Sequence, residues 1–275
     1  DRDVTGVQTC ALPISMNPDQ IIYIEKVKKN RTLVRSEIAV GDLIEITEKN
    51  DFIISAPGVM FRKDKSSVVC EILSDWFAKR QEYKKLMKKA YKEDNDPVMG
   101  SFYDRRQHAY KIKLNDVYGV FAINGWRYTD CNKFISKAIT LTGQRLLQES
   151  IRNMNEYLNK ELGNETHKDY IVTSDTDSLF IQCKDLLLSR HPELDITKHD
   201  QVIPKILELA SELQKMANEF IGNFAKSTFN LGDDATHYFE LKQEVVLDRG
   251  YFAGKRRYAQ HIVRSEEHTS ELQSH

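Results

Sequence analysis

The chain has 275 residues, 40% of them hydrophobic and 29% charged, and its 40 basic and 41 acidic side chains leave a net charge of -1. This balance favours no class of partner, and the length is enough for one large domain or two small ones. No apolar run approaches the roughly 18 residues of a membrane-spanning helix, so no membrane span is expected. The four cysteines are scattered without a CxxC pair, which argues against a zinc site or a disulfide framework and fits a reducing compartment.

Both ends of the chain are predicted to be sequencing-adapter scars. The last residues, Arg264–His275, spell RSEEHTSELQSH, which is the translation of an adapter. The reverse complement of the same DNA encodes VTGVQTCALPI, which is Val4–Ile14. Residues 1–15 and 264–275 are therefore set aside before the fold is considered. What remains, about Met16–Val263, is expected to be an open fragment of a longer protein.

Residues 16–65 carry short, mixed elements. The runs IIYI (21–24) and DLIEI (42–46) are predicted strands, bounded by charged residues and by Gly41. The run SAPGVMF (55–61) is a predicted turn, because its proline and glycine are typical turn residues.

Two long helices joined by a short connection are predicted next. Apolar residues recur every three or four positions over 66–90, and a second helix is expected over about 102–118, ending near Gly119. The intervening KEDNDPVMG has turn chemistry, and so short a connection favours an antiparallel pair. Over 79–92 the first helix carries seven basic residues against one acid. This clustering suits either a phosphate-binding face or an ordinary solvated face.

The rest of the chain alternates helices with strands. The predicted elements are a helix over 133–162, strands over 170–173 and 179–182, a helix over 203–224 and a strand-rich tail over 237–263. Gly250 and Gly254 are expected at bends of the tail. Together these elements predict an α+β domain whose sheet carries an acidic turn, with the helical hairpin as an insertion.

The first candidate site is the sequence SDTDS (174–178). Asp175 and Asp177 stand two positions apart, so on extended backbone both carboxylates project to the same side. Two close carboxylates repel each other, and a hard divalent cation such as Mg²⁺ relieves the repulsion. An ordinary hairpin turn is the alternative, because Asp, Thr and Ser all favour turns.

The second candidate site is the sequence KIKLNDVYG (111–119). On a helix, Lys111, Asn115 and Tyr118 share one face, where a cation, an amide and a ring can grip a triphosphate and pack against a sugar and base. On the preceding helix Arg80 and Lys84 are also four apart, so an antiparallel pair brings both sets to one polyanion. The alternative for the second helix alone is a core Tyr118 beside a solvated Lys111.

The third candidate site is the basic run GKRRYA (254–259). The cations Lys255, Arg256 and Arg257, followed by Tyr258, suit the backbone phosphates of a nucleic acid. An exposed edge strand protected by charge is an equally good alternative. Glu244, on the strand before this run, is a candidate further carboxylate for a metal ion.

In this order, the basic helix, KxxxNxxYG, DTDS and a basic strand ending in Tyr resemble family B DNA polymerases, in particular those of T-even-type bacteriophages. The resemblance covers nearly all of residues 16–263. It implies a right-hand polymerase, with an antiparallel palm sheet over 16–65 and 120–263 and a fingers helical hairpin over 66–119. The implied activity is template-directed DNA synthesis in replication, which transfers a nucleotide from a dNTP to a primer 3′-hydroxyl.

The resemblance also implies roles for single residues. Asp177 would bind both of two Mg²⁺ ions, Asp175 would be its less essential neighbour, and Glu244 would be an accessory carboxylate. Lys255–Tyr258 would hold the primer terminus. Lys111 would also act in catalysis. The residues implied to bind the nucleotide are Arg80, Lys84, Lys111, Asn115 and Tyr118. Three positions depart from the family's usual residues, namely Asp116 for Ser, Ser174 for Gly and Arg256 for Lys.

The implied partners are primer–template DNA, a dNTP and replisome proteins such as a sliding clamp, in the cytoplasm of a host cell if the protein is viral. The family's first metal-binding aspartate, its exonuclease domain and its thumb are expected outside the chain, so the chain alone is expected to be inactive. Two alternatives stay open. One is a non-catalytic, nucleic-acid-binding polymerase relative. The other is a right-hand polymerase of another template class, although reverse transcriptases typically carry DD in place of DTD.

Overall fold

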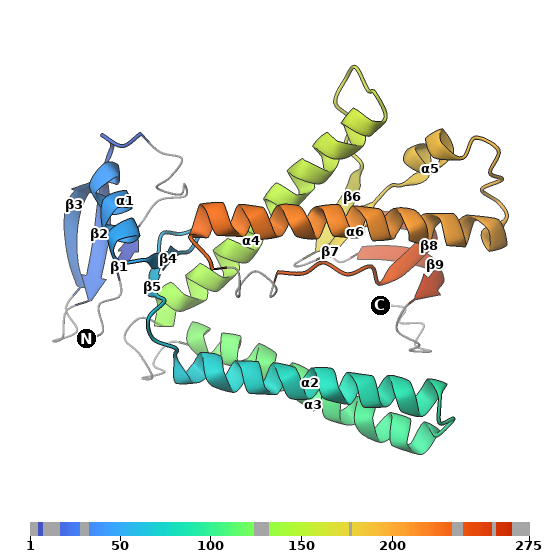
Figure 1. The fold of residues 1–275 in the computed structure, drawn as a ribbon, viewed down its shortest axis with the longest axis horizontal. Helices are drawn as coiled ribbons and strands as arrows, with labels where there is room; N and C mark the ends of the chain where they lie inside the picture. The colour runs from blue at the N-terminus through green and yellow to red at the C-terminus, as the bar shows by residue number, and fades with distance from the viewer. Residues whose placement is uncertain are drawn as a thin grey trace. The chain divides into compact units, whose positions relative to one another are not determined.

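The structure is a computed structural model that describes residues 5–7, 17–27, 33–123, 132–175, 178–232, 239–254 and 257–265. The chain forms two compact units, which divide after Leu141 within one long helix (Figure 1). Helices and small antiparallel sheets make up both units, which confirms the α+β class. In the part of the chain so described, none of the helices combines the length and apolar character needed to cross a bilayer.

The first unit begins with a small antiparallel sheet in the order β1-β2-β3. Its strands are Thr5–Val7, Ile21–Val27 and Leu33–Ala39. The strand predicted over 21–24 is therefore confirmed as part of β2. Strand β1 lies inside the segment predicted to derive from an adapter, and its pairing does not test where those residues came from.

The strand predicted over 42–46 is wrong, because these residues belong to helix α1 (Val40–Lys49). Val40, Leu43 and Thr47 are buried along one side of this helix, and the Thr47 hydroxyl donates to the Leu43 carbonyl at 2.8 Å. Five residues with mixed polarity fit a strand as well as a helix. The helical period emerges only when the window reaches from Val40 to Thr47.

A tight hairpin follows, formed by β4 (Phe52–Ile54) and β5 (Met60–Arg62). The predicted turn is confirmed over its first part, where Gly58 has a φ of 80°, while its last two residues belong to β5. Val59 of the turn packs against Phe134 and Ala138 at the start of helix α4.

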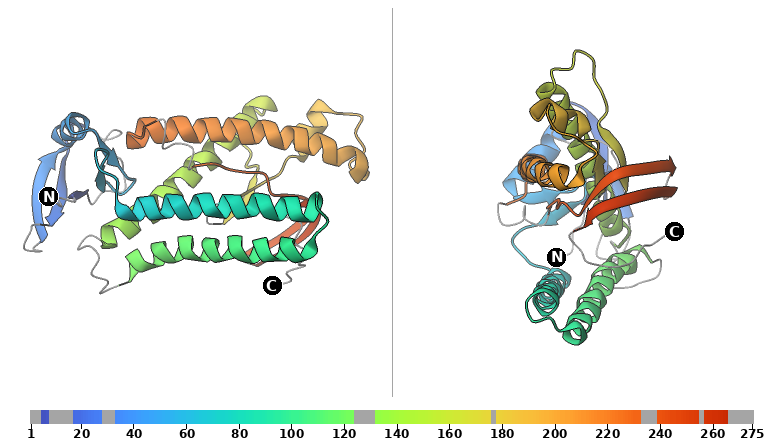
Figure 2. Two further views of the ribbon diagram at one scale, coloured as in Figure 1. Left: turned by 60° about the horizontal axis from the view of Figure 1, so that its bottom comes forward. Right: turned by 90° about the vertical axis from the view of Figure 1, so that its right-hand side faces the viewer.

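Helices α2 (Val68–Lys92) and α3 (Pro97–Ala122) form the predicted antiparallel hairpin, and Figures 1 and 2 show them side by side. Helix α3 starts five residues earlier than predicted, because the Asp96 carboxylate caps its first turn with bonds of 3.0 Å from two backbone amides. Pro97 is the first helical residue, a position where its missing N–H costs nothing. Gly119 lies inside the helix rather than at its end.

Aromatic contacts fix the register of the α2–α3 hairpin. The contacting pairs are Trp76 with Lys113 (5.5 Å), Tyr83 with Tyr110 (5.8 Å between ring centroids) and Tyr91 with Gly100, where an added Cβ would lie 2.5 Å from the ring. Each step forward along α2 is thus a step backward along α3.

The second unit contains most of α4 and all later elements. In chain order the elements are α4 (Asn132–Glu161), β6 (Ile171–Asp175), β7 (Ser178–Ile181), α5 (Lys184–Arg190), α6 (His199–Phe229), β8 (Val245–Gly254) and β9 (Arg257–Ser265). Helix α5 was not predicted. Helix α6 is longer than predicted because its buried stripe continues at four-residue spacing to Phe229. Gly250, predicted at a bend, lies within β8.

The core of the second unit surrounds the β6–β7 hairpin. It combines Met154 and Leu158 of α4, Tyr170 and Ile171 at β6, Leu186 and Leu187 of α5, and Leu209, Leu213 and Ala217 of α6. Three helices therefore pack against one hairpin, which gives the short strands a fixed position that two strands alone would lack.

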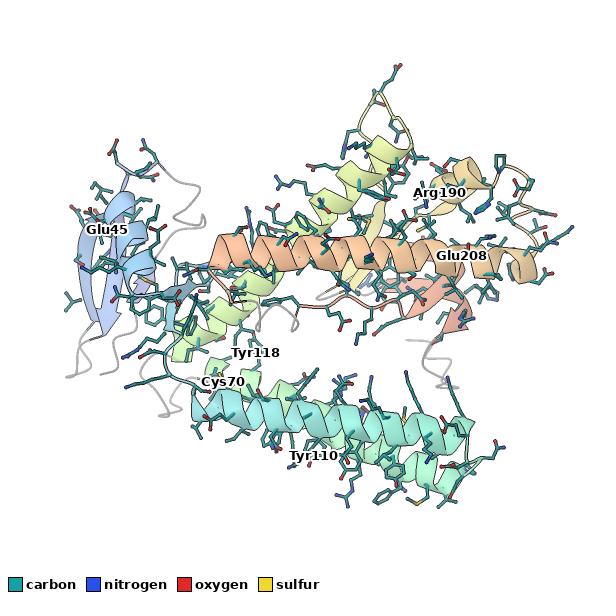
Figure 3. All side chains as sticks on the ribbon, in the orientation of Figure 1. Glu45, Cys70, Tyr110, Tyr118, Arg190 and Glu208 are labelled. Carbon is teal, nitrogen blue, oxygen red and sulfur yellow. The ribbon has the colours of Figure 1, made fainter. Side chains whose placement is uncertain are left out.

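An ion pair joins α5 to α6 at the edge of this core. Arg190 of α5 donates to both oxygens of Glu212 on α6, at 2.6 and 2.9 Å, and the Tyr157 hydroxyl donates to the same carboxylate at 2.8 Å. These bonds, led by the one from Arg190, lower the pKa of Glu212 to about 2. Figure 3 labels Arg190 beside α6.

We expect the Glu212 carboxylate to make part of the free energy of unfolding depend on pH. Because the pKa of Glu212 is lowered from 4.5 to about 2, its contribution is complete above pH 4.5 and is lost as pH falls toward 2. Urea unfolding at pH 6 and pH 3 should show that the free energy of unfolding falls less between these two pH values for Glu212→Gln than for the wild type. Glu208→Gln, one turn away on α6, is the matched control. An unchanged acid loss in Glu212→Gln would contradict the prediction.

Candidate functional site

The acidic turn closes the β6–β7 hairpin. Asp175 ends β6 and pairs across the ladder with Ser178 of β7, so Thr176 and Asp177 form the two-residue connection. These two residues, and the side chain of Asp175, lie outside the described part of the structure. The predicted hairpin is confirmed, whereas the common projection of the two carboxylates stays a prediction.

Two buried asparagines on α4 hold the start of this hairpin. Asn155 accepts a hydrogen bond from the Tyr170 amide at 2.8 Å and donates to the Asp169 carboxylate at 2.7 Å. One turn further, Asn159 accepts from the Lys168 amide at 2.9 Å and donates to the Lys168 carbonyl at 2.7 Å. The entry to β6 is therefore bonded side chain to backbone onto a helix, which fixes where the acidic turn begins.

Removing one of these amides should be costly. Asn155→Ala leaves the Tyr170 amide and the Asp169 carboxylate without this partner, and a buried polar group left unpaired costs about 1–3 kcal/mol. We expect urea unfolding of the chain to show a loss of this size. Asn153→Ala, on the same helix and outside this hydrogen-bond network, is the control and should lose much less. Equal losses would show that the network contributes little.

Three aromatic rings connect β7 to the β8–β9 hairpin, which carries the basic run. The ring of Phe180 lies 5.5 Å from Phe252 and 6.2 Å from Tyr258, and these last two rings are 5.9 Å apart. The structure thus brings Tyr258 to the strand that leaves the acidic turn. Arg257 and Tyr258 are exposed, and Lys255 and Arg256 lie outside the described residues. Because β9 is a sheet edge, the charged-edge alternative stays open.

Glu244 lies directly before β8, not on a strand as predicted, and its side chain is exposed. The backbone N–H of its neighbour Gln243 donates to the Gln214 side-chain oxygen of α6 at 2.8 Å. The Asn218 side chain of α6 accepts from the Leu241 N–H at 2.7 Å and donates to the Leu241 carbonyl at 2.9 Å. The segment is therefore firmly placed. Across the described residues, no three His, Cys, Asp or Glu side chains lie close enough together to hold a metal ion, so the metal role of Glu244 stays a prediction.

Lys111, Asn115 and Tyr118 form one exposed stripe of α3, as predicted. Beside it runs the half-buried stripe that packs on α2, made of Tyr110, Leu114 and Val117. Tyr118 is 41% exposed, so the alternative of a core tyrosine is wrong. Its hydroxyl lies 2.7 Å from the Thr140 hydroxyl of α4 (Figure 3), which ties the end of α3 to the next helix.

Arg80 and Lys84 are half-buried on α2. Because Trp76 faces Lys113 and Tyr83 faces Tyr110, Arg80 is level with Lys111 along the hairpin. The Arg80 Nε is buried, and no hydrogen-bond partner is found for it among the described residues. Lys84 lies one turn further along α2. The convergence of the two basic sets on one polyanion stays a prediction.

The chain matches known proteins along the region that carries these features. Residues 23–194 match the family model described as DNA polymerase family B. The chain belongs to this family. Membership confirms the resemblance drawn from the motifs and decides against a polymerase of another template class.

Three proteins similar to this chain are named as DNA polymerases. The DNA polymerase catalytic subunit of Alcelaphine herpesvirus 1 (strain C500) is 32% identical over 147 residues, which are 48% of this chain and 14% of the viral protein. The DNA-directed DNA polymerase of Escherichia phage RB69 is 26% identical over 172 residues, 55% of this chain and 17% of the phage protein. The DNA polymerase of Thermococcus gorgonarius is 26% identical over 204 residues, 74% and 20% of the two chains. The family B chain therefore spans 20% or less of the lengths of these three relatives.

Proposed function

We propose that this chain is the fingers and palm part of an enzyme that copies DNA. The reaction is nucleotidyl transfer, in which the primer 3′-oxygen bonds to the α-phosphorus of a dNTP and pyrophosphate leaves. The single observation that carries the proposal is the tight β6–β7 hairpin, whose strands pair up to Asp175 and Ser178 of the sequence DTDS and whose first residues pack in the second unit's core. Because the chain belongs to DNA polymerase family B, we assign the catalytic carboxylates to this acidic turn.

In this proposal, residues 66–119, which hold α2 and most of α3, are the fingers, and residues 16–65 and 120–263 belong to the palm. The helices suit the role because one exposed face of α3 carries a cation, an amide and a ring without disturbing the packing with α2. Residues 1–15 and 264–275 remain assigned to adapter scars.

The metal centre is assigned to the acidic turn, with Asp177 as the main ligand, Asp175 beside it and Glu244 as an accessory carboxylate. Carboxylate oxygens on a short turn fit Mg²⁺, which takes one or two carboxylates together with water and substrate phosphate. Two such ions supply Lewis-acid stabilisation of the attacking and leaving oxygens. The chain's own part is to hold the carboxylates at a fixed place, through Asn155 and Asn159.

The nucleotide site is assigned to the fingers helices. Lys111 would bind the triphosphate and, as a catalytic cation, stabilise the charge that develops on the leaving pyrophosphate, with Arg80 level with it. Asn115 would contact the triphosphate, Tyr118 would lie near the new base pair and Lys84 would extend the basic surface. The half-buried position of Arg80 suits this role, because a cation in a lower dielectric interacts more strongly with phosphate.

The DNA site is assigned to the β8–β9 hairpin, with Lys255–Tyr258 on the backbone of the primer terminus. The partners are then primer–template DNA and a dNTP, with replisome proteins such as a sliding clamp bound through other parts of the enzyme. For a viral protein, the place of action would be the host cytoplasm.

A non-catalytic, nucleic-acid-binding relative is the competing proposal. The deciding experiment is primer extension by a chimera in which residues 16–263 replace the matching part of a phage family B polymerase. Extension that requires Mg²⁺ and a templated dNTP supports the enzymatic proposal. DNA binding by a folded chimera that never extends a primer would favour the non-catalytic relative.

A further inference from the structure

We propose that Phe180, Phe252 and Tyr258, here called the aromatic cluster, act as positioning residues that set the place of the primer grip relative to the acidic turn. The inference rests on the proposed function, in which the basic run and the acidic turn act on the same primer–template DNA. It adds a role for Phe180, Phe252 and Gly250, which lie outside the motifs.

The two structures that the cluster joins are separate two-stranded sheets, β6–β7 and β8–β9. All three centroid distances, from 5.5 to 6.2 Å, fall in the range of favourable tilted aromatic pairs. Phe180 stands three residues after Asp177, and Tyr258 directly follows the three cations of the basic run. One ring contact therefore links the metal turn to the DNA-binding turn within a few residues of each.

The base of the β8–β9 hairpin is held by polar contacts with α6 rather than by aromatic rings. Asn218 and Gln214 of α6 bond the segment before β8, and the Asp248 carboxylate lies 3.4 Å from His199 at the start of α6. Phe252 is four residues beyond Asp248, toward the tip that carries the basic run. The cluster is therefore placed to hold the tip, which carries the DNA contacts.

Gly250 provides the room that the cluster needs. Residues 250 and 252 point to the same side of a strand, and the Phe252 ring lies back over Gly250. A Cβ added at Gly250 would lie 2.7 Å from the Phe252 ring, a separation that forces the ring to move. The ring also contacts Phe180 and Tyr258, so we expect its displacement to disturb these contacts.

Tyr258 remains 44% exposed although it packs on two rings. Part of the ring is thus available to DNA while the rest contacts the protein. The apolar contacts restrain the Tyr258 ring before DNA binds, and this restraint lowers the entropy cost of binding.

The test measures the affinity of the full chain for a primer–template with a recessed 3′ end, by fluorescence anisotropy at fixed salt. Phe180→Leu, Phe252→Leu and Gly250→Ala should each weaken binding about five- to tenfold, because each removes or displaces ring contacts. Phe180→Tyr keeps the ring and should restore affinity to within about twofold of the wild type. Combining Phe180→Leu with Tyr258→Leu should add little to Tyr258→Leu alone, since contacting residues that act as a unit are not additive.

The matched control is Phe220→Leu, which removes a ring from the stacked pair of Phe220 and Phe224 on α6 (5.9 Å). It should lower the unfolding temperature and leave DNA affinity unchanged. Hydrogen exchange of the free chain gives a readout without DNA, in which Phe180→Leu should speed exchange at the tip ends of β8 and β9 and leave α6 unaffected.

Each outcome has a distinct meaning. If the cluster variants lose thermal stability but keep their DNA affinity, the rings only pack and the positioning role is overturned. If the wild type fails to bind DNA, or if Arg257→Ala leaves the DNA affinity unchanged, the proposed primer grip is wrong. Accelerated hydrogen exchange at the tip of β8–β9 in Phe180→Leu would then show that the rings couple the two hairpins without a role in DNA binding. If exchange at the tip is also unchanged, the coupling itself is refuted.

Discussion

Asp177→Asn should abolish primer extension in the chimera, while Asp175→Asn should leave measurable activity. Asn has the shape of Asp without its charge, so the fold and the β6–β7 pairing should persist while the metal ligand is lost. Loss of metal-ion stabilisation, worth several kcal/mol, corresponds to a fall of about a thousandfold or more in rate. Steady-state extension with Mg²⁺ over a range of dNTP concentrations measures both variants.

Two controls separate loss of chemistry from loss of fold. Both variants should bind primer–template DNA as the unaltered chimera does and should unfold at a similar urea concentration. A chelator should stop the residual extension by Asp175→Asn. If Asp175 proves indispensable and Asp177 dispensable, the family roles have been assigned to the wrong members of this turn.

Local periodicity in the sequence was enough to predict the helical hairpin, the acidic turn and the strand-rich tail. These elements carry their own signals, namely a stripe of apolar residues, a capping Asp96 and a short acidic run between apolar strands. The errors fell where a signal was too short or ambiguous. DLIEI fits two periods, and Pro97 is typical both of a turn and of the first position of a helix.

The supports of the site could not be predicted, because they depend on contacts between distant residues. Asn155 meets Tyr170 only after α4 has packed on β6, and Asn218 meets Leu241 only after the tail has returned to α6. The polar residues among the apolar positions of α4 were the one sequence signal for side chains that bond to a neighbouring backbone. The sequence holds no comparable sign of the aromatic cluster, since three aromatic residues on strands are more often ordinary sheet residues.

Lys111→Ala should weaken nucleotide use by the chimera more than any other substitution on the α2–α3 hairpin. Removing one preorganised donor costs about 2–4 kcal/mol of transition-state stabilisation, or roughly 30-fold to several hundredfold in kcat/KM. Lys111 suits this measurement because its side chain is exposed and lies outside the half-buried stripe of α3 that packs on α2. Single-turnover incorporation of a templated dNTP gives the rate and the nucleotide affinity separately.

Lys113→Ala is the matched comparison for Lys111→Ala, because the two lysines lie on different sides of α3. Lys113 lies off the stripe of Lys111, Asn115 and Tyr118, and its ammonium lies 5.5 Å from the Trp76 ring and 5.1 Å from the Tyr110 ring. Lys113→Ala should therefore cost about 0.5–1 kcal/mol of hairpin stability while leaving nucleotide affinity nearly intact. Lys85→Ala, on the exposed outer side of α2, is the control expected to change neither. Equal losses of nucleotide affinity from Lys111→Ala and Lys113→Ala would refute the single binding face, since the two side chains leave α3 in different directions.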